Sequence, residues 1–152
     1  MEYMVQTSSP QLLAIDDIKR VTVSYKDIIK LLQQLTKAPM IQKQDYLDII
    51  SQLGNNHFIF VLTLQDKPIG MITLFIEQKI IHHGGKVGHI EDVVVDKEHR
   101  GKGYSKQLIQ HAITIAKHYQ CYKCILNCTD QMKPVYEKQG FSHKTNGMSL
   151  YF

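Results

Sequence analysis

The sequence predicts an α+β (α/β) fold in which strands and helices follow in the order β-αα-β-β-β-α-β-α-β. Between residues 57 and 95, apolar residues run in short blocks bounded by turn residues, a pattern typical of strands. Between residues 24 and 53, and again after residue 104, they recur at helical spacing instead. No internal repeat, low-complexity tract or linker interrupts the 152 residues, so we expect one domain over residues 1–152.

The N-terminal third is expected to hold a strand and two helices. A short strand is predicted at residues 18–23. Ser24 then offers an N-cap to a first helix, and Pro39 separates that helix from a second one, which ends at Gly54. The apolar stripes of the two helices are Ile28, Leu31, Leu32 and Leu35 in the first, and Tyr46, Ile49, Ile50 and Leu53 in the second.

The middle and the end of the chain alternate between strands and helices. Residues 57–64 and 69–80 are expected to form a β-hairpin around the turn at residues 65–68. A central strand follows at residues 87–95, and a long amphipathic helix begins near Lys106. The last elements are a strand at 122–128, a short helix at 134–139 and a strand at 141–152, kinked at Gly147.

Composition favours an ordinary soluble protein, with 43% hydrophobic and 21% charged residues. The net charge of +4 comes from 18 basic and 14 acidic residues, which are too evenly scattered to predict a nucleic-acid partner. No apolar stretch is long enough for a transmembrane helix, and residues 1–10 lack the basic start and apolar core of a signal peptide. We therefore expect a cytoplasmic location, with no membrane partner.

The three cysteines, Cys121, Cys124 and Cys128, are spaced in a way that could suggest a metal site. However, they fall in a predicted strand, where Cys124 and Cys128 share one face with Leu126. We expect small buried side chains here, with neither a metal nor a disulfide framework.

The most informative segment follows the central strand and reads Arg100-Gly101-Lys102-Gly103-Tyr104-Ser105-Lys106. A glycine turn that leads into a helix leaves free backbone N–H groups at the positive end of the helix dipole. Arg100, Lys102 and Lys106 add charge-assisted hydrogen bonds. This pattern predicts a pyrophosphate-binding loop, and the alternative is a plain turn between a strand and a basic helix. Neither the Walker loop nor the dinucleotide fingerprint has this spacing.

The loop resembles the Arg/Gln-x-x-Gly-x-Gly/Ala loop of the GNAT-type acyl-CoA N-acyltransferases. Arg100 takes the first position and Gly103 the fourth, whereas Ser105 stands in the sixth, where the family has Gly or Ala. The resemblance implies the GNAT fold, a mixed central β-sheet flanked by helices, and acetyl-CoA as the co-substrate.

Further motifs extend the resemblance from Ile28 to Phe152 and narrow it to the glucosamine 6-phosphate N-acetyltransferases of that superfamily. These motifs are Leu35-Thr36 and the segments 77–82, 90–95, 121–123 and 136–141. The resemblance implies transfer of an acetyl group to the 2-amine of glucosamine 6-phosphate, an amino-sugar phosphate, on the route to UDP-N-acetylglucosamine. It also implies a homodimer that exchanges its C-terminal strands.

The same resemblance assigns the acetyl-CoA site. Backbone groups of Val93, Val94 and Val95 would pair with the pantetheine arm, and one of their N–H groups would polarise the thioester oxygen. Tyr136 would protonate the leaving thiolate. The pyrophosphate would be held by the loop residues Arg100, Gly101, Lys102, Gly103, Tyr104, Ser105 and Lys106.

The amine substrate is assigned to carboxylates and polar groups. Glu91 and Asp92 accept hydrogen bonds from an amine and from sugar hydroxyls, with Asp92 nearer the amine. They point apart on a regular strand, so both can line one site only if a bulge intervenes. The alternative is a solvated acidic pair. Thr36, Lys79 and His82 are carried over as sugar-phosphate contacts, although Lys79 is equally well explained as a surface lysine.

Several positions depart from the family pattern. Asn127 replaces an Asp whose backbone carbonyl holds the amine or takes its proton, and Met132 replaces an Asn. The last five residues, 148–152, carry no charge, whereas the family reaches the phosphate with basic residues there. We expect Lys79 and His82, helped by Lys144 of the partner subunit, to take over this contact.

Two other functions remain as alternatives. A GNAT enzyme acting on protein lysines or a polyamine would need an open acidic groove, whereas the hairpin here is basic and rich in histidine. A non-catalytic acetyl-CoA sensor fits the changes at Ser105, Asn127 and Met132, but not the presence of Tyr136 and the carboxylate pair.

Overall fold

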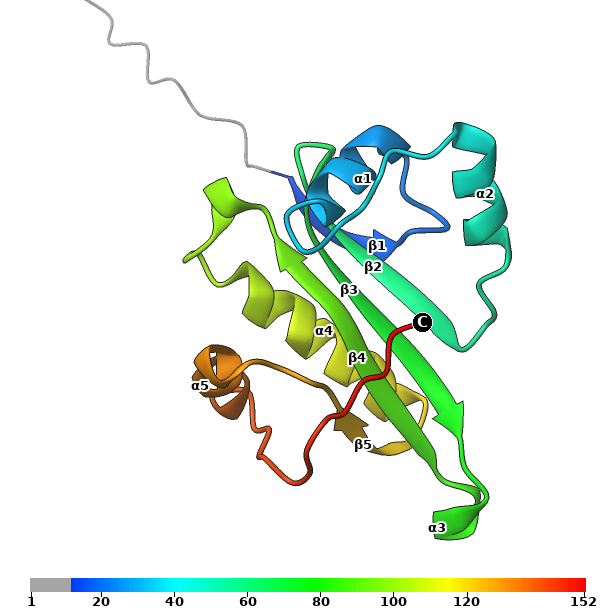
Figure 1. Cartoon of the computed structure of the whole chain (residues 1–152), viewed down its shortest axis with the longest axis vertical. Coiled ribbons are helices and arrows are strands. Elements are labelled where there is room, and N and C mark those ends of the chain that lie inside the picture. Colours follow the sequence, from blue (N-terminus) through cyan, green and yellow to red (C-terminus); the bar gives the residue numbers. More distant parts are fainter. Residues whose placement is uncertain (1–11) are drawn as a thin grey trace, which may run out of the picture.

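The computed structural model describes residues 12–152 (Figure 1). Residues 1–10, where no signal peptide is expected, lie outside the described residues. In chain order the elements are β1 (Leu13–Asp17), α1 (Tyr25–Leu32), α2 (Lys43–Ser51), β2 (His57–Leu64), β3 (Lys67–Gln78), α3 (Ile81–Gly84), β4 (Lys86–Val95), α4 (Tyr104–His118), β5 (Cys121–Ile125) and α5 (Lys133–Glu137), with short 3-10 turns at Lys97–His99 and Asp130–Met132.

The strands form one mixed sheet in the order β1-β2-β3-β4-β5, which confirms the predicted α+β class. Neighbouring strands run antiparallel except for β4 and β5, which are parallel because α4 connects them. Helices α1 and α2 cover one face of the sheet, and α4 lies along the other (Figure 1). Within residues 12–152, no helix is long and apolar enough to cross a membrane.

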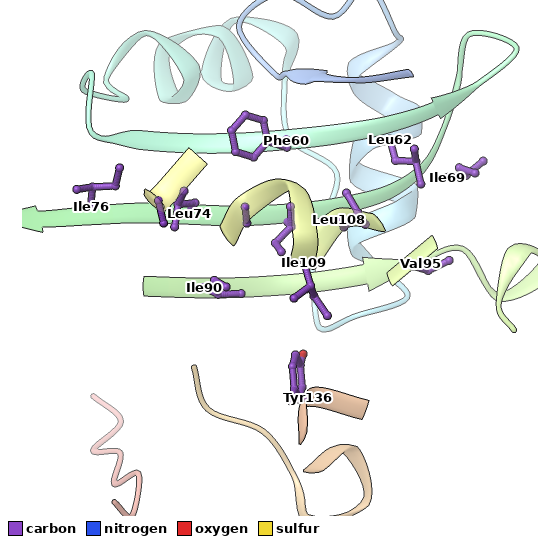
Figure 2. Packing of buried hydrophobic residues seen from close by; sticks show 13 residues of the cluster. Phe60, Leu62, Ile69, Leu74, Ile76, Ile90, Val95, Leu108, Ile109 and Tyr136 are labelled. Carbon is purple, nitrogen blue, oxygen red and sulfur yellow. The ribbon is translucent and has the colours of Figure 1, made fainter. Parts of the chain in front are cut away.

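Alternation along the strands divides the core between the two faces. Ile28 and Leu31 of α1 pack with Val61, Met71 and Val94. On the other face, α4 inserts its apolar stripe against the side chains of β2, β3 and β4, as Figure 2 shows. The stripe consists of the buried residues Leu108, Ile109, Ala112 and Ala116.

The predicted hairpin is confirmed, with β2 at its expected bounds and β3 starting two residues early. The connecting turn needs only Gln65 and Asp66, which both have positive φ, 50° and 63°. Two successive left-handed residues are typical of the tight turn whose twist matches that of the strands. Pro68 fits within β3 because the register between β2 and β3 shifts there.

Two N-terminal predictions were wrong. The first strand lies at β1 rather than at residues 18–23, because the Asp17 carbonyl accepts hydrogen bonds from the Arg20 and Val21 N–H groups and closes a turn. In the expected stripe of the second helix, Ile49 is 51% exposed, whereas Tyr46, Ile50 and Leu53 pack against the core as predicted. Ser24 does precede α1, but its side chain makes no capping hydrogen bond.

The strand predicted at 122–128 ends at Ile125, so Cys128 does not share a strand face with Cys124. Cys124 is half-buried, and burial raises the pKa of its thiol to about 11. Cys128 is exposed, contrary to the expectation of three buried cysteines.

The strand predicted at residues 141–152 is also absent. These residues form no helix or strand, and the red segment of Figure 1 carries no arrow. A strand needs a neighbouring edge to satisfy its backbone, and no described strand pairs with this segment. Its apolar side chains after Gly147 are left in solvent, with Met148 at 97% and Tyr151 at 92% exposure.

We predict that Leu108→Ala lowers the free energy of unfolding by about 2–5 kcal/mol, since Leu108 is fully buried between α4 and the sheet. Urea unfolding followed by circular dichroism measures this change. Leu47→Ala is the control, because Leu47 on α2 is 46% exposed and its truncation should change stability far less. Equal losses in both variants would contradict the placement of the core.

Candidate active site

One edge of β4 is unpaired after the first four residues of the strand. β4 pairs with β3 along nearly its whole length, but with β5 only from Lys86 to His89. Residues 90–95 therefore face no described strand on the β5 side. Unpaired backbone N–H and C=O groups at such an edge can bind an extended ligand as an added strand would.

A cavity of about 830 Å³ lies in this opening. It gathers most of the residues that the sequence assigned to the site, from five separate segments of the chain. They are Thr36, Glu91, Asp92, Val93, Val94, Val95, Arg100, Gly101, Gly103, Tyr104, Ser105, Asn127 and Tyr136.

A β-bulge brings both carboxylates to the cavity. Thr73 of β3 pairs with Glu91 and Met71 with Val94, so β4 carries one residue more than β3 in this interval. The extra residue is accommodated by Asp92, whose φ of 50° is left-handed. The condition under which Glu91 and Asp92 can line one site is therefore met.

The glycine loop forms the end wall of the cavity. Gly101 and Gly103 have φ of 74° and 82°, and a Cβ atom at either would meet nothing within 4 Å. Gly103 is the N-cap residue of α4, so the free N–H groups of the first helical turn face outward beside it. The Arg100 side chain is anchored by its Nε, which donates to the Val95 carbonyl at 3.0 Å. Lys102 and Lys106 are exposed and do not line the cavity.

Tyr136 enters the cavity from α5 and is 8% exposed. In Figure 2 its ring stands between α5 and β4, with the hydroxyl oxygen at the end nearer to β4. Burial raises the pKa of this phenol above its ordinary value, and the neighbouring Cys128 adds to the shift. The side chain therefore holds its proton at neutral pH.

The loop after β5 forms the wall opposite β4. Leu126, Asn127 and Cys128 line the cavity because the chain leaves the sheet where β4 diverges. The Asn127 side chain lies against Gly147, where a Cβ atom would come within 2.7 Å of Asn127 Oδ1. Met132 also lines the cavity.

Three predicted substrate contacts lie elsewhere. Lys79 Nζ is 2.6 Å from Glu77 Oε1, and Glu77 also contacts His89. The His82 ring packs against Tyr122 with 4.3 Å between the ring centroids, and Lys144 is exposed in the C-terminal segment. Within residues 12–152, the lining of the cavity includes Arg100 and His99 but no lysine.

The sequence did not point to Gln34 and His99, which also line the cavity. Gln34 Nε2 donates to Asp96 Oδ1 at 2.7 Å, and Asp96 Oδ2 lies 2.6 Å from His99 Nδ1. The Gln34 hydrogen bond, followed by that of His99, lowers the pKa of the Asp96 carboxyl. Only the position of Gln34 directly before Leu35-Thr36 could have indicated a role.

The sequence model of the acetyltransferase (GNAT) family matches residues 26–141. The probable glucosamine 6-phosphate N-acetyltransferase 2 of Oryza sativa subsp. japonica is 37% identical over 134 residues, which cover 84% of this chain and 81% of that protein. The glucosamine 6-phosphate N-acetyltransferase of Arabidopsis thaliana is also 37% identical, over 84% of this chain and 89% of that protein.

A solved structure agrees with these matches. The crystal structure of glucosamine-6-phosphate N-acetyltransferase from Arabidopsis thaliana superposes with a TM-score of 0.84 at 33% identity, covering 93% of this chain and 99% of that one. The shared fold includes the mixed sheet and its flanking helices. The chain therefore belongs to the acetyltransferase (GNAT) family, whose members use acetyl-CoA, in the branch that holds the glucosamine 6-phosphate N-acetyltransferases.

Proposed function

We propose that the protein transfers the acetyl group of acetyl-CoA to the 2-amine of glucosamine 6-phosphate, giving N-acetylglucosamine 6-phosphate and CoA. Relatives that match most of the chain carry the name of this enzyme. The observation that carries the proposal is that the open edge of β4, the glycine loop, both carboxylates and Tyr136 line one cavity.

The acetyl-CoA half of the site is proposed to use mainly backbone groups. The free edge at Val93, Val94 and Val95 would bind the pantetheine arm, and one N–H there would polarise the thioester oxygen. The glycine loop and the first turn of α4 would hold the pyrophosphate, for which the open space at Gly101 and Gly103 leaves room. Lys102 and Lys106, exposed beside the loop, would add charge.

The amine half is proposed to use Glu91, Asp92, Asn127 and Thr36. The carboxylates would accept hydrogen bonds from the amine and the sugar hydroxyls, with Asp92 nearer the amine. The neutral amine nitrogen then attacks the thioester carbon, and the C–S bond breaks. The backbone carbonyl of Asn127 would accept a hydrogen bond that holds the amine, and Tyr136 would give its proton to the departing sulfur. The proton that the nitrogen loses would restore the phenol, so that the products are the amide and the free thiol of CoA.

The phosphate of the substrate is proposed to be held at a dimer interface. The exposed apolar C-terminal segment is a surface that a second copy could bury. The partner subunit's Lys144 would then join Lys79 and His82 at the phosphate. The homodimer, the single domain and the cytoplasmic location all stay predictions.

Tyr136→Phe should lower kcat by about 10²–10⁴-fold with little change in acetyl-CoA affinity, since the phenol acts on the leaving group. Because burial raises the pKa of Tyr136, wild-type kcat should fall through loss of the phenol proton only at a pH above the ordinary pKa of a tyrosine. Steady-state kinetics and isothermal titration calorimetry measure these effects. An unchanged kcat in Tyr136→Phe would remove this residue from the mechanism.

Gly103→Val should abolish measurable acetyl-CoA binding, because a branched side chain would occupy the space that the pyrophosphate needs. The control is Gly84→Val in α3, which introduces a similar backbone strain at a φ of 72° outside the cavity. Calorimetric titration should show near-normal affinity for acetyl-CoA in the control. Wild-type affinity in Gly103→Val would make the assignment of the loop wrong.

The wild-type protein should acetylate glucosamine 6-phosphate with a higher kcat/KM than glucosamine, because charge-assisted hydrogen bonds to phosphate contribute about 1.5–3 kcal/mol each. Lys79→Ala and Lys144→Ala should each reduce this preference, measured by release of free CoA. Equal values for the two sugars would reject glucosamine 6-phosphate as the specific substrate.

The same assay tests the non-catalytic alternative. Acetyl-CoA binding without turnover of these sugars, a histone-tail peptide or spermidine would favour a non-catalytic sensor.

A further inference from the structure

A group of hydrogen bonds holds the connection between β4 and the glycine loop. Asp96 follows β4 directly, and its N–H donates to the Ile69 carbonyl at 2.8 Å. Its carboxylate receives the Gln34 amide on one oxygen at 2.7 Å and lies 2.6 Å from His99 Nδ1 through the other. The Gln34 carbonyl oxygen in turn accepts from the Lys97 N–H at 2.8 Å. The nitrogen and the oxygen of the Gln34 side-chain amide thus both form hydrogen bonds to the short turn that follows β4.

These bonds join two segments that are distant in the sequence. Gln34 and Asp96 are 62 positions apart. Gln34 lies just beyond the C-terminal end of α1, two residues before Thr36, whereas Asp96 and His99 lie just before Arg100. Thr36 and Arg100 both line the cavity. The group therefore joins the segment that carries Thr36, a proposed sugar contact, to the turn that precedes the loop proposed to bind the pyrophosphate.

We propose that Gln34, Asp96 and His99 form a positioning network that fixes the glycine loop relative to the end of α1 and so holds the two halves of the active site in register. The inference rests on the proposed function for the identity of the two ligands. None of the three residues needs to touch the reacting atoms.

The energetic reason is preorganisation. Backbone N–H groups bind an anion well only when they are already aimed at it, because ordering a loop upon binding subtracts from affinity. The carboxylate of Asp96 makes the network strong, since hydrogen bonds to a charged acceptor are worth about twice those between neutral groups.

The test exchanges donor and acceptor within the network. Gln34→Glu keeps an oxygen for the Lys97 N–H but places a carboxylate against Asp96. Asp96→Asn in the same chain then restores complementarity, because the new amide can donate to Glu and its oxygen can still face His99. The matched control is Gln44→Glu on α2, where Gln44 Nε2 donates to Asp48 Oδ1 at 2.8 Å on the exposed surface, outside the cavity.

We expect Gln34→Glu to raise the Kd for acetyl-CoA by about 10–100-fold, the factor that corresponds to one lost charge-assisted hydrogen bond. The KM for the amine should rise as well, while kcat at saturation changes by less than about threefold, because the reacting groups are untouched. The double variant should recover most of the affinity. Gln44→Glu should leave Kd, KM and kcat unchanged.

Two outcomes would overturn the network. One is a Kd in Gln34→Glu no higher than in Gln44→Glu. The other is a double variant as weak as Gln34→Glu alone. A variant that is merely less folded would lower kcat without raising KM, and thermal melting of each variant checks this point.

Failure of the network can be told apart from failure of the proposed function. Titration with acetyl-CoA needs no amine, so it tests the network even if wild-type protein does not acetylate glucosamine 6-phosphate. Turnover by wild type with unchanged binding in Gln34→Glu would reject the network and leave the proposed function standing.

Discussion

The arrangement of the site depends on the loss of pairing between β4 and β5 after His89. Up to that point the two strands are close-packed, since a Cβ atom at Gly88 would lie 3.1 Å from Cys124 Sγ. Beyond His89 the two strands no longer pair, β5 ends, and the chain turns away from β4 to line the cavity. The same divergence leaves one edge of β4 free, and Tyr136 from α5 and Asn127 from the loop after β5 line the same cavity as the carboxylates.

Local patterns made much of the fold predictable from the sequence. The hairpin, the central strand and the long helix each carry a periodicity and a turn signal that act over a few residues. The first strand was misplaced because residues 18–23 are rich in the β-branched residues typical of strands, and only the hydrogen bonds to Asp17 show that the chain turns there. The strand predicted at the C-terminus is absent because a strand also requires a partner strand, and none of the described strands pairs with this segment.

The residues of the candidate site were also predictable only in part. The glycine loop and the carboxylate pair could be predicted because each consists of residues that are adjacent in the sequence. The sequence showed that a bulge was needed for Glu91 and Asp92 to line one site. It could not show that the bulge is present, because this depends on the register between β4 and β3. Gln34 and His99 could not be found, because their relation to Asp96 appears only when α1 packs on the sheet beside the end of β4.

The three cysteines differ in burial, so one of them can be labelled selectively at the site. Thiolates react with alkylating reagents, and a pKa of about 11 keeps Cys124 almost wholly protonated at neutral pH. Burial also raises the pKa of Cys121. Cys128 is exposed and lines the cavity, so a maleimide or a spin label should attach there first. A spectroscopic probe can thus be placed on the wall of the site without altering the sequence.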